Sequence, residues 1–362
     1  MKQTSPFVKL TLALLVFCTL LYVLRLVTEI PDATVSETSS NVIHGRTMGT
    51  TYTVTLVDLA DSHQLTSIEQ AIEQRLQTIN QLMSTYITNS EISTFNQSQS
   101  TSWIPVSREF ADLVQVAQSI SERTNGALDI TVGPAVNLWN FGPQPKPATA
   151  VALPTQDEIQ DVLAHIGYQH LHVRDEPPAL RKDDPKLVID LSAIAKGYAV
   201  DQIAILLESL PSPLEYMVEI GGEIKTSSHE TNGRRWRIGI QDPENLNGIP
   251  AHIVNLSNHA IATSGDYINY YEIQGVRYSH TINPRTAKPV THDLASAAVV
   301  MDSCASADAW ATALLVLGPQ AAYDLSNELG IAVILFTRSD SQLVSQMTRP
   351  MQNLIASKGT PE

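Results

Sequence analysis

Strand and helix patterns follow one another irregularly along this chain, and this order constrains its fold more than any other feature. Residues 50–57 alternate polar and apolar side chains like a strand. The next segment carries apolar residues at helical spacing, namely Leu65, Ile68, Ile72, Leu76, Ile79 and Met83. Further strands are predicted at residues 215–220, 235–240, 251–256 and 331–336, with a hairpin that turns at Gln274 and Gly275. Because helices and strands mix without a strict βαβ rhythm, we expect an α+β fold in which a mixed sheet core carries flanking helices.

Local signals predict where several helices begin. Ser107 is a predicted N-cap, because its side chain can accept a hydrogen bond from the first turn of the helix that follows it. Thr155 and Glu158 have the spacing of a capping box. Two further helices are predicted to begin near Ser306, as the N-cap, and near Pro319.

Composition limits the class of protein and its partners. Of the 362 residues 43% are hydrophobic, so the chain can bury a sizeable core. The net charge is −14 and the sequence pI is about 5.1. Nucleic acid is excluded as a partner, because a phosphate backbone selects for a basic surface.

The N-terminus carries an almost uninterrupted apolar stretch from residue 9 to residue 27, about the length that spans a bilayer as a helix. Lys2 precedes it and Lys9 is its first residue, and Arg25 is the only other charge within it. We therefore expect residues 1–27 to be an uncleaved membrane anchor with the rest of the chain outside the cytoplasm. A cleaved or lipidated signal is the alternative; Cys18 suggests a lipoprotein, but the bulky Phe17 precedes it where lipoprotein signals use a small residue.

The remaining sequence divides into three parts. Residues 28–42 are polar and predict a tether, residues 43–350 a single folded domain, and residues 351–362 a C-terminal tail. Cys304 is the only cysteine of the predicted domain, so the domain cannot form an internal disulfide. Since no histidine lies near it in the sequence, we expect Cys304 to be a small buried residue and not a nucleophile.

The stretch "LVIDLSAIAKGYAVDQIA" (residues 187–204) carries one lysine among small and apolar residues. It is predicted to begin as an apolar strand that ends at Asp190, and to continue as a helix that contains Lys196. From the local pattern alone, the ammonium group of Lys196 could equally reach solvent or meet a ligand.

The segment "SADAWATALLVLG" (residues 306–318) places Asp308 and Thr312 four positions apart, and therefore on one helix face. Two oxygen ligands in this arrangement suit a hard cation such as Mg²⁺. The alternative is structural, because an aspartate in the first turn complements the helix dipole and a threonine can bond to a backbone carbonyl one turn earlier.

Histidines offer a further candidate. His280 is predicted at the end of the second hairpin strand, where it could act as a general base or simply be a surface residue. His170 and His172 are predicted to share one face of a solvated strand, in preference to a metal pair. No Walker motif and no GxGxxG motif is present in the sequence, and the single Gly-Gly pair at 221–222 is weak evidence for a ligand site.

Taken together, these stretches resemble the ApbE family of Mg-dependent FAD:protein FMN transferases. The resemblance runs from His44 to Leu335. Its motifs are "GRTMGTTYTV", "MSTYITNSEISTFN", "TNGALDITVGPAVNLWNFG", "IDLSAIAKGYAVD", "VEIGGEI", "WRIGIQDP", "AIATSGDYINYYEIQGVRYSHTINPRTAKPV" and "SADAWATALLVLG". Each motif alone is modest, whereas their common order along the chain is specific.

The resemblance implies a membrane-anchored enzyme on the periplasmic face of the bacterial inner membrane. It would split FAD at the pyrophosphate, transfer FMN to a threonine or serine hydroxyl of an acceptor flavoprotein, and release AMP. In this family the acceptors are flavin-carrying subunits of membrane redox pumps, such as the sodium-pumping NADH:quinone reductase and Rnf-type complexes. A Mg-dependent FAD pyrophosphatase and a non-catalytic periplasmic FAD-binding protein are the alternatives.

The resemblance also implies roles for individual residues. Mg²⁺ would be held by Asp308, Thr312 and the main-chain carbonyl of Ala193, and His280 would deprotonate the acceptor hydroxyl. The residues implied for FAD binding are Met48, Tyr86, Ala127, Leu128, Asp129, Asp190, Lys196 and Ile282. The sequence departs from the family pattern beside His280, at Asn283 and Ala287, so acceptor or flavin affinity is the property that these changes affect most directly.

Overall fold

The computed structural model describes residues 40–57, 59, 62–143, 153–211, 214–227, 235–245, 248–267, 269–339 and 342–355. No helix in these ranges is both long and apolar enough to cross a membrane. The predicted anchor and residues 28–39 of the predicted tether lie outside the described residues. The first strand already begins at Ser40, and Met351 is fully buried, so the folded unit extends past the predicted limits of 43 and 350 at both ends.

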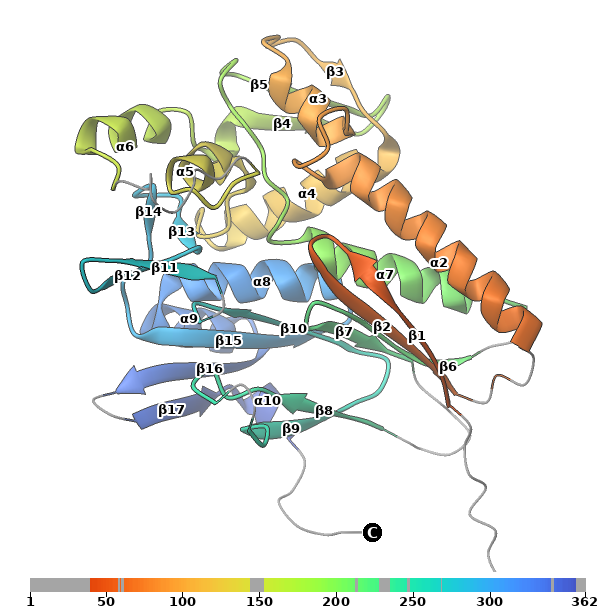
Figure 1. Cartoon of the computed structure of the whole chain (residues 1–362). Coiled ribbons are helices and arrows are strands. Elements are labelled where there is room, and N and C mark those ends of the chain that lie inside the picture. The colour runs from red at the N-terminus through yellow and green to blue at the C-terminus, as the bar shows by residue number, and fades with distance from the viewer. Residues whose placement is uncertain are drawn as a thin grey trace, which may run out of the picture. The chain divides into compact units, whose positions relative to one another are not determined.

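An eight-stranded sheet forms the centre of the fold (Figure 1), and every neighbouring pair in it is antiparallel. In spatial order its strands are β1 (Ser40–Thr47), β2 (Thr50–Val57), β6 (Glu215–Ile220), β7 (Glu223–Thr226), β10 (Ala260–Gly265), β15 (Leu294–Met301), β16 (Ala332–Ser339) and β17 (Gln342–Met347). The α+β class is confirmed, but the sheet is antiparallel where a mixed sheet was expected. Two-residue turns explain part of this: Met48–Gly49 and Gly221–Gly222 have positive φ and join adjacent strands directly.

Helices cover one face of this sheet, and a small hairpin covers the other (Figure 1). The helices on that face include α2 (Ser62–Met83), α3 (Glu91–Gln97), α4 (Arg108–Arg123), α7 (Ala195–Glu208), α8 (Cys304–Leu317) and α9 (Pro319–Glu328). Helices α5 (Gly133–Leu138) and α6 (Gln156–Leu163) pack in a separate small cluster, and α10 (Arg349–Gln352) lies on the hairpin side of the sheet. The covering hairpin pairs β8 (Trp236–Ile240) with β9 (His252–Leu256). Burial from both sides explains why β15 is apolar along its length: Ala297 and Val299 join the core under the helices, while Ala298 and Val300 join the core under the hairpin.

Smaller elements surround this core. A three-stranded sheet has the order β3 (Ile104–Pro105), β5 (Ala179–Lys182) and β4 (Leu171–Arg174), and two-stranded pairs join β11 (Tyr270–Ile273) to β12 (Val276–Ser279) and β13 (Ile282–Asn283) to β14 (Lys288–Pro289). Short 3₁₀ helices occupy Ile130–Val132 and Tyr168–His170. These pieces matter because several candidate site residues lie on them.

The local sequence signals are largely confirmed. The side chain of Ser107 accepts a hydrogen bond from the backbone N–H of Phe110 at 3.2 Å, and Thr155 with Glu158 forms a full capping box. The β11–β12 hairpin turns at Gln274 and Gly275, whose φ angles of 53° and 78° suit a two-residue turn.

Two sequence predictions of local structure are wrong. The N-cap of α8 is Ser303, whereas Ser306 lies in the first turn and donates its backbone N–H to the Ser303 hydroxyl at 3.2 Å. His170 and His172 do not lie on one strand, because His170 belongs to a 3₁₀ turn; both histidines instead face Asp183, at 3.8 and 2.8 Å. The predicted cap and the observed cap are both serines, three positions apart, so the local sequence does not distinguish them.

Residues 187–190, predicted as a strand, pair with no strand of the described structure. Instead, the side chain of Asn96 takes the place of a neighbouring strand: its Nδ2 donates to the Ile189 carbonyl at 2.8 Å, and its Oδ1 accepts from the Ile189 N–H at 2.8 Å. The next residue, Asp190, donates its N–H to the Ile130 carbonyl at 2.7 Å. The segment is therefore extended, as its apolar pattern predicts, but it is held by a side chain.

We expect Asn96→Ala to lower the free energy of unfolding by about 2 kcal/mol, because both backbone groups of the buried Ile189 would lose their partner. Chemical denaturation of the full-length protein measures this. The matched control is Gln97→Ala on the same helix, where the exposed side chain donates one hydrogen bond to the Thr88 carbonyl. Equal effects of the two substitutions would contradict the role given to Asn96.

Candidate active site

Helices α7 and α8 approach each other closely at the residues predicted to hold a metal. A Cβ atom on Gly197 would lie 2.3 Å from the Cys304 carbonyl oxygen, so only glycine fits at this position. The Gly197 N–H donates to Asp308 Oδ2 at 3.0 Å. In a regular helix this N–H would donate to the carbonyl four residues earlier, that of Ala193. The contact with Asp308 therefore leaves the Ala193 carbonyl without its helical donor.

These contacts give a set of oxygen donors that fits a hard cation. Asp308 is 2% exposed. Thr312 follows it one turn later on α8, and its Oγ1 lies 3.0 Å from Ser264 Oγ at the end of β10. A carboxylate, a hydroxyl and a main-chain carbonyl are oxygen ligands of the kind that a hard cation such as Mg²⁺ prefers. Within the described ranges no three His, Cys, Asp or Glu side chains are grouped around a metal position, so an ion here depends on the neutral oxygens.

Lys196 lies beside two carboxylates, one of which the sequence did not reveal. Its Nζ is 2.7 Å from Glu223 Oε1 and 3.6 Å from Asp308 Oδ1. Burial acts to lower the pKa of Lys196, but the charges of Asp308 and Glu223 outweigh burial and raise it. Lys196 is therefore a fixed cation at the same place as the predicted metal ligands.

Glu223 is the buried carboxylate of this cluster that the sequence did not reveal. It is 2% exposed, and burial raises the pKa of its carboxyl group to about 8, although Lys196 opposes the shift. Its Oε2 has no hydrogen-bond partner among the described residues. The sequence feature that could have revealed it is a charged residue directly after a Gly-Gly pair. Gly221 and Gly222 form the β6–β7 turn, so Glu223 is the first residue of a strand, and it is buried.

His280 has the hydrogen-bond pattern of a neutral base. Its Nδ1 lies 3.0 Å from the Asn269 carbonyl oxygen, which can only accept, so Nδ1 carries the proton and Nε2 keeps its lone pair. Burial lowers the pKa of His280, and the positive charge of Lys196 lowers it further. Phe141 contacts the imidazole edge, with ring centroids 6.3 Å apart. His280 is thus held neutral near neutral pH, within the electrostatic reach of Lys196.

The candidate flavin residues divide into two groups. Tyr86 is 68% exposed, and Asp190 is close enough to raise the pKa of Tyr86, although burial of the phenol contributes more. Met48 lies in the β1–β2 turn and packs partly against the main core. These side chains remain accessible to a ligand.

The second group is buried, so its side chains are not accessible to a ligand. Ala127, Leu128 and Ile282 are 1%, 2% and 6% exposed. Asp129 is used structurally: its carboxylate accepts from Thr131 and, at 2.9 Å, from the Tyr168 N–H, and burial raises its pKa. The Asp190 N–H nevertheless donates to the carbonyl of Ile130, the residue after Asp129, so the buried segment 127–130 is bonded to an accessible candidate residue. Among the candidate flavin residues, the side chains that a ligand could reach are those of Met48, Tyr86, Asp190 and Lys196.

Cys304 is fully buried, as the sequence predicts, and burial is the main cause that raises the pKa of its thiol. Its Sγ lies 3.7 Å from the Ile224 carbonyl. A protonated thiol in this position packs and does not act as a nucleophile.

We expect Gly197→Ala to destabilise the fold by about 1–3 kcal/mol, because the new methyl group would overlap the Cys304 carbonyl and push the two helices apart. We further expect weaker Mg²⁺ binding, since the same movement breaks the hydrogen bond to Asp308. Thermal unfolding with and without Mg²⁺ measures both effects. Ile205→Ala on the half-exposed face of α7 is the control, and unchanged stability in Gly197→Ala would contradict the close approach.

Comparison with known proteins identifies the family of this chain. The sequence profile of the ApbE family matches residues 48–335. The FAD:protein FMN transferase of Escherichia coli K12 is 38% identical over 323 residues, which cover 89% of this chain and 91% of that relative. The FAD:protein FMN transferase of Vibrio cholerae serotype O1 is 40% identical over 298 residues, 82% of this chain and 87% of the relative.

Solved structures of flavin transferases share the fold. The flavin transferase ApbE of Vibrio cholerae superposes with a TM-score of 0.78 at 37% identity, covering 88% of this chain and 99% of that one. The apo form of the Pseudomonas stutzeri flavinyl transferase ApbE gives 0.79 at 34% identity, covering 88% and 97%. The resemblance found in the sequence is confirmed by profile, relatives and fold alike, and the chain belongs to the ApbE family of flavin transferases.

Proposed function

We propose that this chain transfers FMN from FAD to a threonine or serine hydroxyl of an acceptor flavoprotein, in a Mg²⁺-dependent reaction that releases AMP. Membership of the ApbE family supports the transferase activity. The observation that carries the mechanism is the gathering of Asp308, Lys196 and Glu223 at the contact of α7 with α8. A fixed cation beside an oxygen-donor metal site is suited to a diphosphate and not to the flavin ring.

In this proposal the acceptor oxygen attacks the phosphorus of the FMN half of FAD. A new O–P bond forms, the bond from that phosphorus to the bridging oxygen breaks, and AMP leaves with the bridging oxygen. The acceptor proton passes to Nε2 of His280, the nitrogen that the Asn269 contact leaves free. Lys196 neutralises charge on the diphosphate as it accumulates on the leaving oxygen.

A bound Mg²⁺ would be held by Asp308, Thr312 and the Ala193 carbonyl, and would supply charge neutralisation at the diphosphate oxygens. The residues present fit this role, because the Gly197–Asp308 hydrogen bond leaves the Ala193 carbonyl without its helical donor and fixes the Asp308 carboxylate at the first turn of α7. Asp190 lies three residues before Ala193. Its Oδ1 accepts a hydrogen bond from the Ser192 N–H at 2.8 Å, which fixes the orientation of the carboxylate.

Location and partners complete the proposal. The apolar residues 9–27 support an anchor in the bacterial inner membrane with the enzyme on the periplasmic face. Acceptors would then be subunits of membrane redox pumps of the sodium-pumping NADH:quinone reductase or Rnf type. Protease treatment of intact spheroplasts tests the location: digestion of the domain supports it, and protection of the domain until the membrane is lysed contradicts it.

One incubation separates the candidate activities. Full-length protein is mixed with FAD, Mg²⁺ and an acceptor subunit, and intact masses and nucleotides are measured together. Covalent FMN on the acceptor supports transfer. Free FMN with AMP, and no modified acceptor, supports a pyrophosphatase, and bound but unchanged FAD supports a binding protein.

A further inference from the structure

We propose that Asp201 is a positioning residue that sets the spacing of helices α7 and α8, and through it the geometry of the Mg²⁺ site. Asp201 touches neither the predicted metal ligands nor any flavin residue in the described structure. It lies on α7, one turn after Gly197, and is 8% exposed. The inference rests on the proposed function, because it concerns the metal that the transfer requires.

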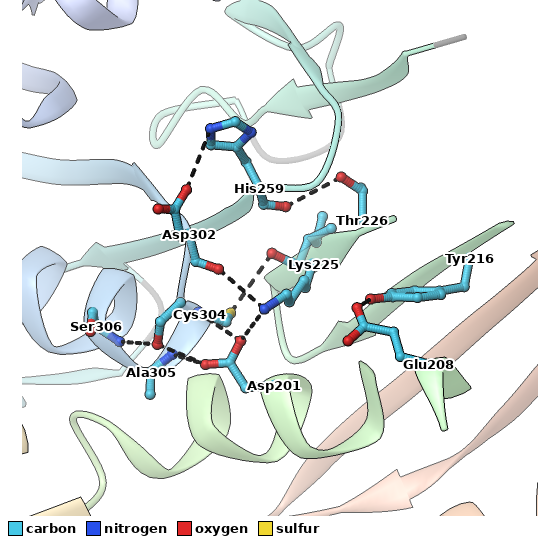
Figure 2. Close-up of polar contacts among 12 residues, drawn as sticks. Asp201, Glu208, Tyr216, Lys225, Thr226, His259, Asp302, Cys304, Ala305 and Ser306 are labelled. Atoms are coloured by element: carbon cyan, nitrogen blue, oxygen red, sulfur yellow. Dashed lines mark hydrogen bonds and ion pairs between the residues drawn. The ribbon is translucent and has the colours of Figure 1, made fainter. Parts of the chain in front are cut away.

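The carboxylate of Asp201 binds the first residues of α8 (Figure 2). Its Oδ1 accepts from the Cys304 N–H at 3.0 Å, and its Oδ2 accepts from the Ala305 N–H at 2.9 Å. Oδ2 also accepts from the Ser303 hydroxyl at 2.8 Å. An aspartate from one helix thus satisfies backbone donors at the N-terminus of another, where its negative charge also complements the helix dipole.

This contact is not an ordinary cap within one helix. Ser303 already serves as the N-cap of α8, because its Oγ accepts from the Ser306 N–H. Asp201 takes the remaining donors from outside the helix, so its removal would free α8 to shift along α7. The role follows from geometry. A capping side chain from the same helix fixes only the end of that helix, whereas a capping side chain from a neighbouring helix also fixes the distance between the two helices.

Lys225 of β7 completes the arrangement (Figure 2). Its Nζ lies 3.0 Å from Asp201 Oδ1 and donates to the Asp302 carbonyl at 3.1 Å. The buried charge of Asp201 is therefore paired, and the residue that precedes Ser303 is tied to the sheet. A buried carboxylate with a cation and several N–H donors is stable where an unpaired one would not be.

The two helices are consequently joined at two levels. At the first, the Gly197 N–H binds Asp308 and the glycine backbone contacts the Cys304 carbonyl. At the second, one turn further along α7, Asp201 binds the start of α8. The Ala193 carbonyl lies just before α7, whereas Asp308 and Thr312 lie on α8. With both sets of contacts in place, the distance between the Ala193 carbonyl and the two ligands on α8 is fixed.

The test compares Asp201→Asn with Glu208→Gln. Both lie on α7, and Glu208 forms a single hydrogen bond to the Tyr216 hydroxyl, away from the α8 contact (Figure 2). Asn is isosteric but offers one acceptor oxygen, so it cannot satisfy all the donors that Asp201 binds. Mg²⁺ affinity of the full-length protein is measured by the Mg²⁺-induced shift of Tm and by the fluorescence of Trp310, which lies on α8 between Asp308 and Thr312.

We expect Asp201→Asn to raise the Kd for Mg²⁺ about 10-fold, the scale seen when groups behind metal ligands are removed. At saturating Mg²⁺ its KM for FAD should match that of the wild-type protein. Glu208→Gln keeps an acceptor oxygen for the Tyr216 hydroxyl and should leave the Kd for Mg²⁺ unchanged. If Asp201→Asn does not fold, Ser303→Ala replaces it; because the Ser303 hydroxyl also donates to Asp201 Oδ2, this variant removes one of the bonds between the two helices, and a higher Kd for Mg²⁺ is again expected.

The outcomes separate this inference from the proposed function. Unchanged Mg²⁺ affinity in the folded Asp201 or Ser303 variant, in a wild-type background that transfers FMN, overturns the positioning role alone. If the variant binds Mg²⁺ more weakly but the wild-type protein performs no transfer, the positioning role is supported and the proposed function is overturned. A wild-type protein that binds no Mg²⁺ overturns both.

Discussion

The Asp308→Ala variant is expected to lose Mg²⁺-dependent transfer, with kcat lower by at least about 100-fold. Asp308 is the only carboxylate of the predicted ligand set, and it is buried where Lys196 and the Gly197 N–H both face it. Its removal takes away the charge that would hold the cation and leaves Lys196 paired with Glu223 alone. Initial rates of AMP release at increasing Mg²⁺ concentration measure the loss.

The control for this variant is Asp324→Ala on the neighbouring helix α9, an exposed aspartate that accepts from Gln320. It should keep the wild-type rate. The Mg²⁺-induced increase of Tm should disappear in Asp308→Ala and persist in the control. An Asp308→Ala protein that is folded and still turns over FAD at near the wild-type rate would rule out Asp308 as a ligand.

The His280→Ala variant is expected to slow transfer about 10²–10⁴-fold while FAD binds with its original affinity. Among the described residues, the imidazole bonds to the Asn269 carbonyl and packs against Phe141, and Lys196 acts on it through its charge. Removing it deletes the proton acceptor and leaves Lys196 and Asp308 in place. Single-turnover kinetics with acceptor, together with FAD titration, separates the two effects.

The pH profile of the wild-type protein provides a second readout for His280. The base must be neutral to accept a proton, so the rate falls as pH drops through its pKa. Because burial and Lys196 lower this pKa, the acidic limb should lie below the ordinary histidine value of 6.5. His44→Ala, an exposed histidine on β1, is the control and should leave both rate and profile unchanged. A His280→Ala protein with an unaltered rate and limb would exclude His280 as the base.

The sequence predicted best what is determined within a few residues. The Ser107 cap, the Thr155–Glu158 capping box and the turn at Gln274 and Gly275 all depend on neighbouring side chains and backbone, and all are present. Asp308 and Thr312 lie on one helix for the same reason. The start of α8 was misplaced because two serines three positions apart give the same local signal.

Contacts between distant elements were beyond such reasoning. The pairing of Lys196 with Glu223 joins a helix to a strand that begins 15 residues after α7 ends, and no local pattern announces it. Asn96 substitutes for a strand beside Ile189 from 93 positions away. An apolar segment has the same pattern whether a strand or a side chain binds it, so its extended conformation was predictable and its partner was not.

The family resemblance supplied roles that the residues alone left open. The local sequence did not decide whether the ammonium group of Lys196 reaches solvent or meets a ligand. In the structure it lies between the carboxylates of Glu223 and Asp308. The resemblance gave less for the buried run Ala127–Asp129, where the side chains pack or cap and only the backbone remains for a ligand.

The most direct test of the central claim is the ratio of AMP released to FMN bound covalently to the acceptor. Full-length protein, FAD, Mg²⁺ and an acceptor subunit are incubated, and AMP is quantified alongside the intact mass of the acceptor. Transfer to a hydroxyl predicts one AMP for each FMN attached, with no modified acceptor when its target threonine or serine is replaced by alanine. AMP released with free FMN and an unmodified acceptor would contradict the claim.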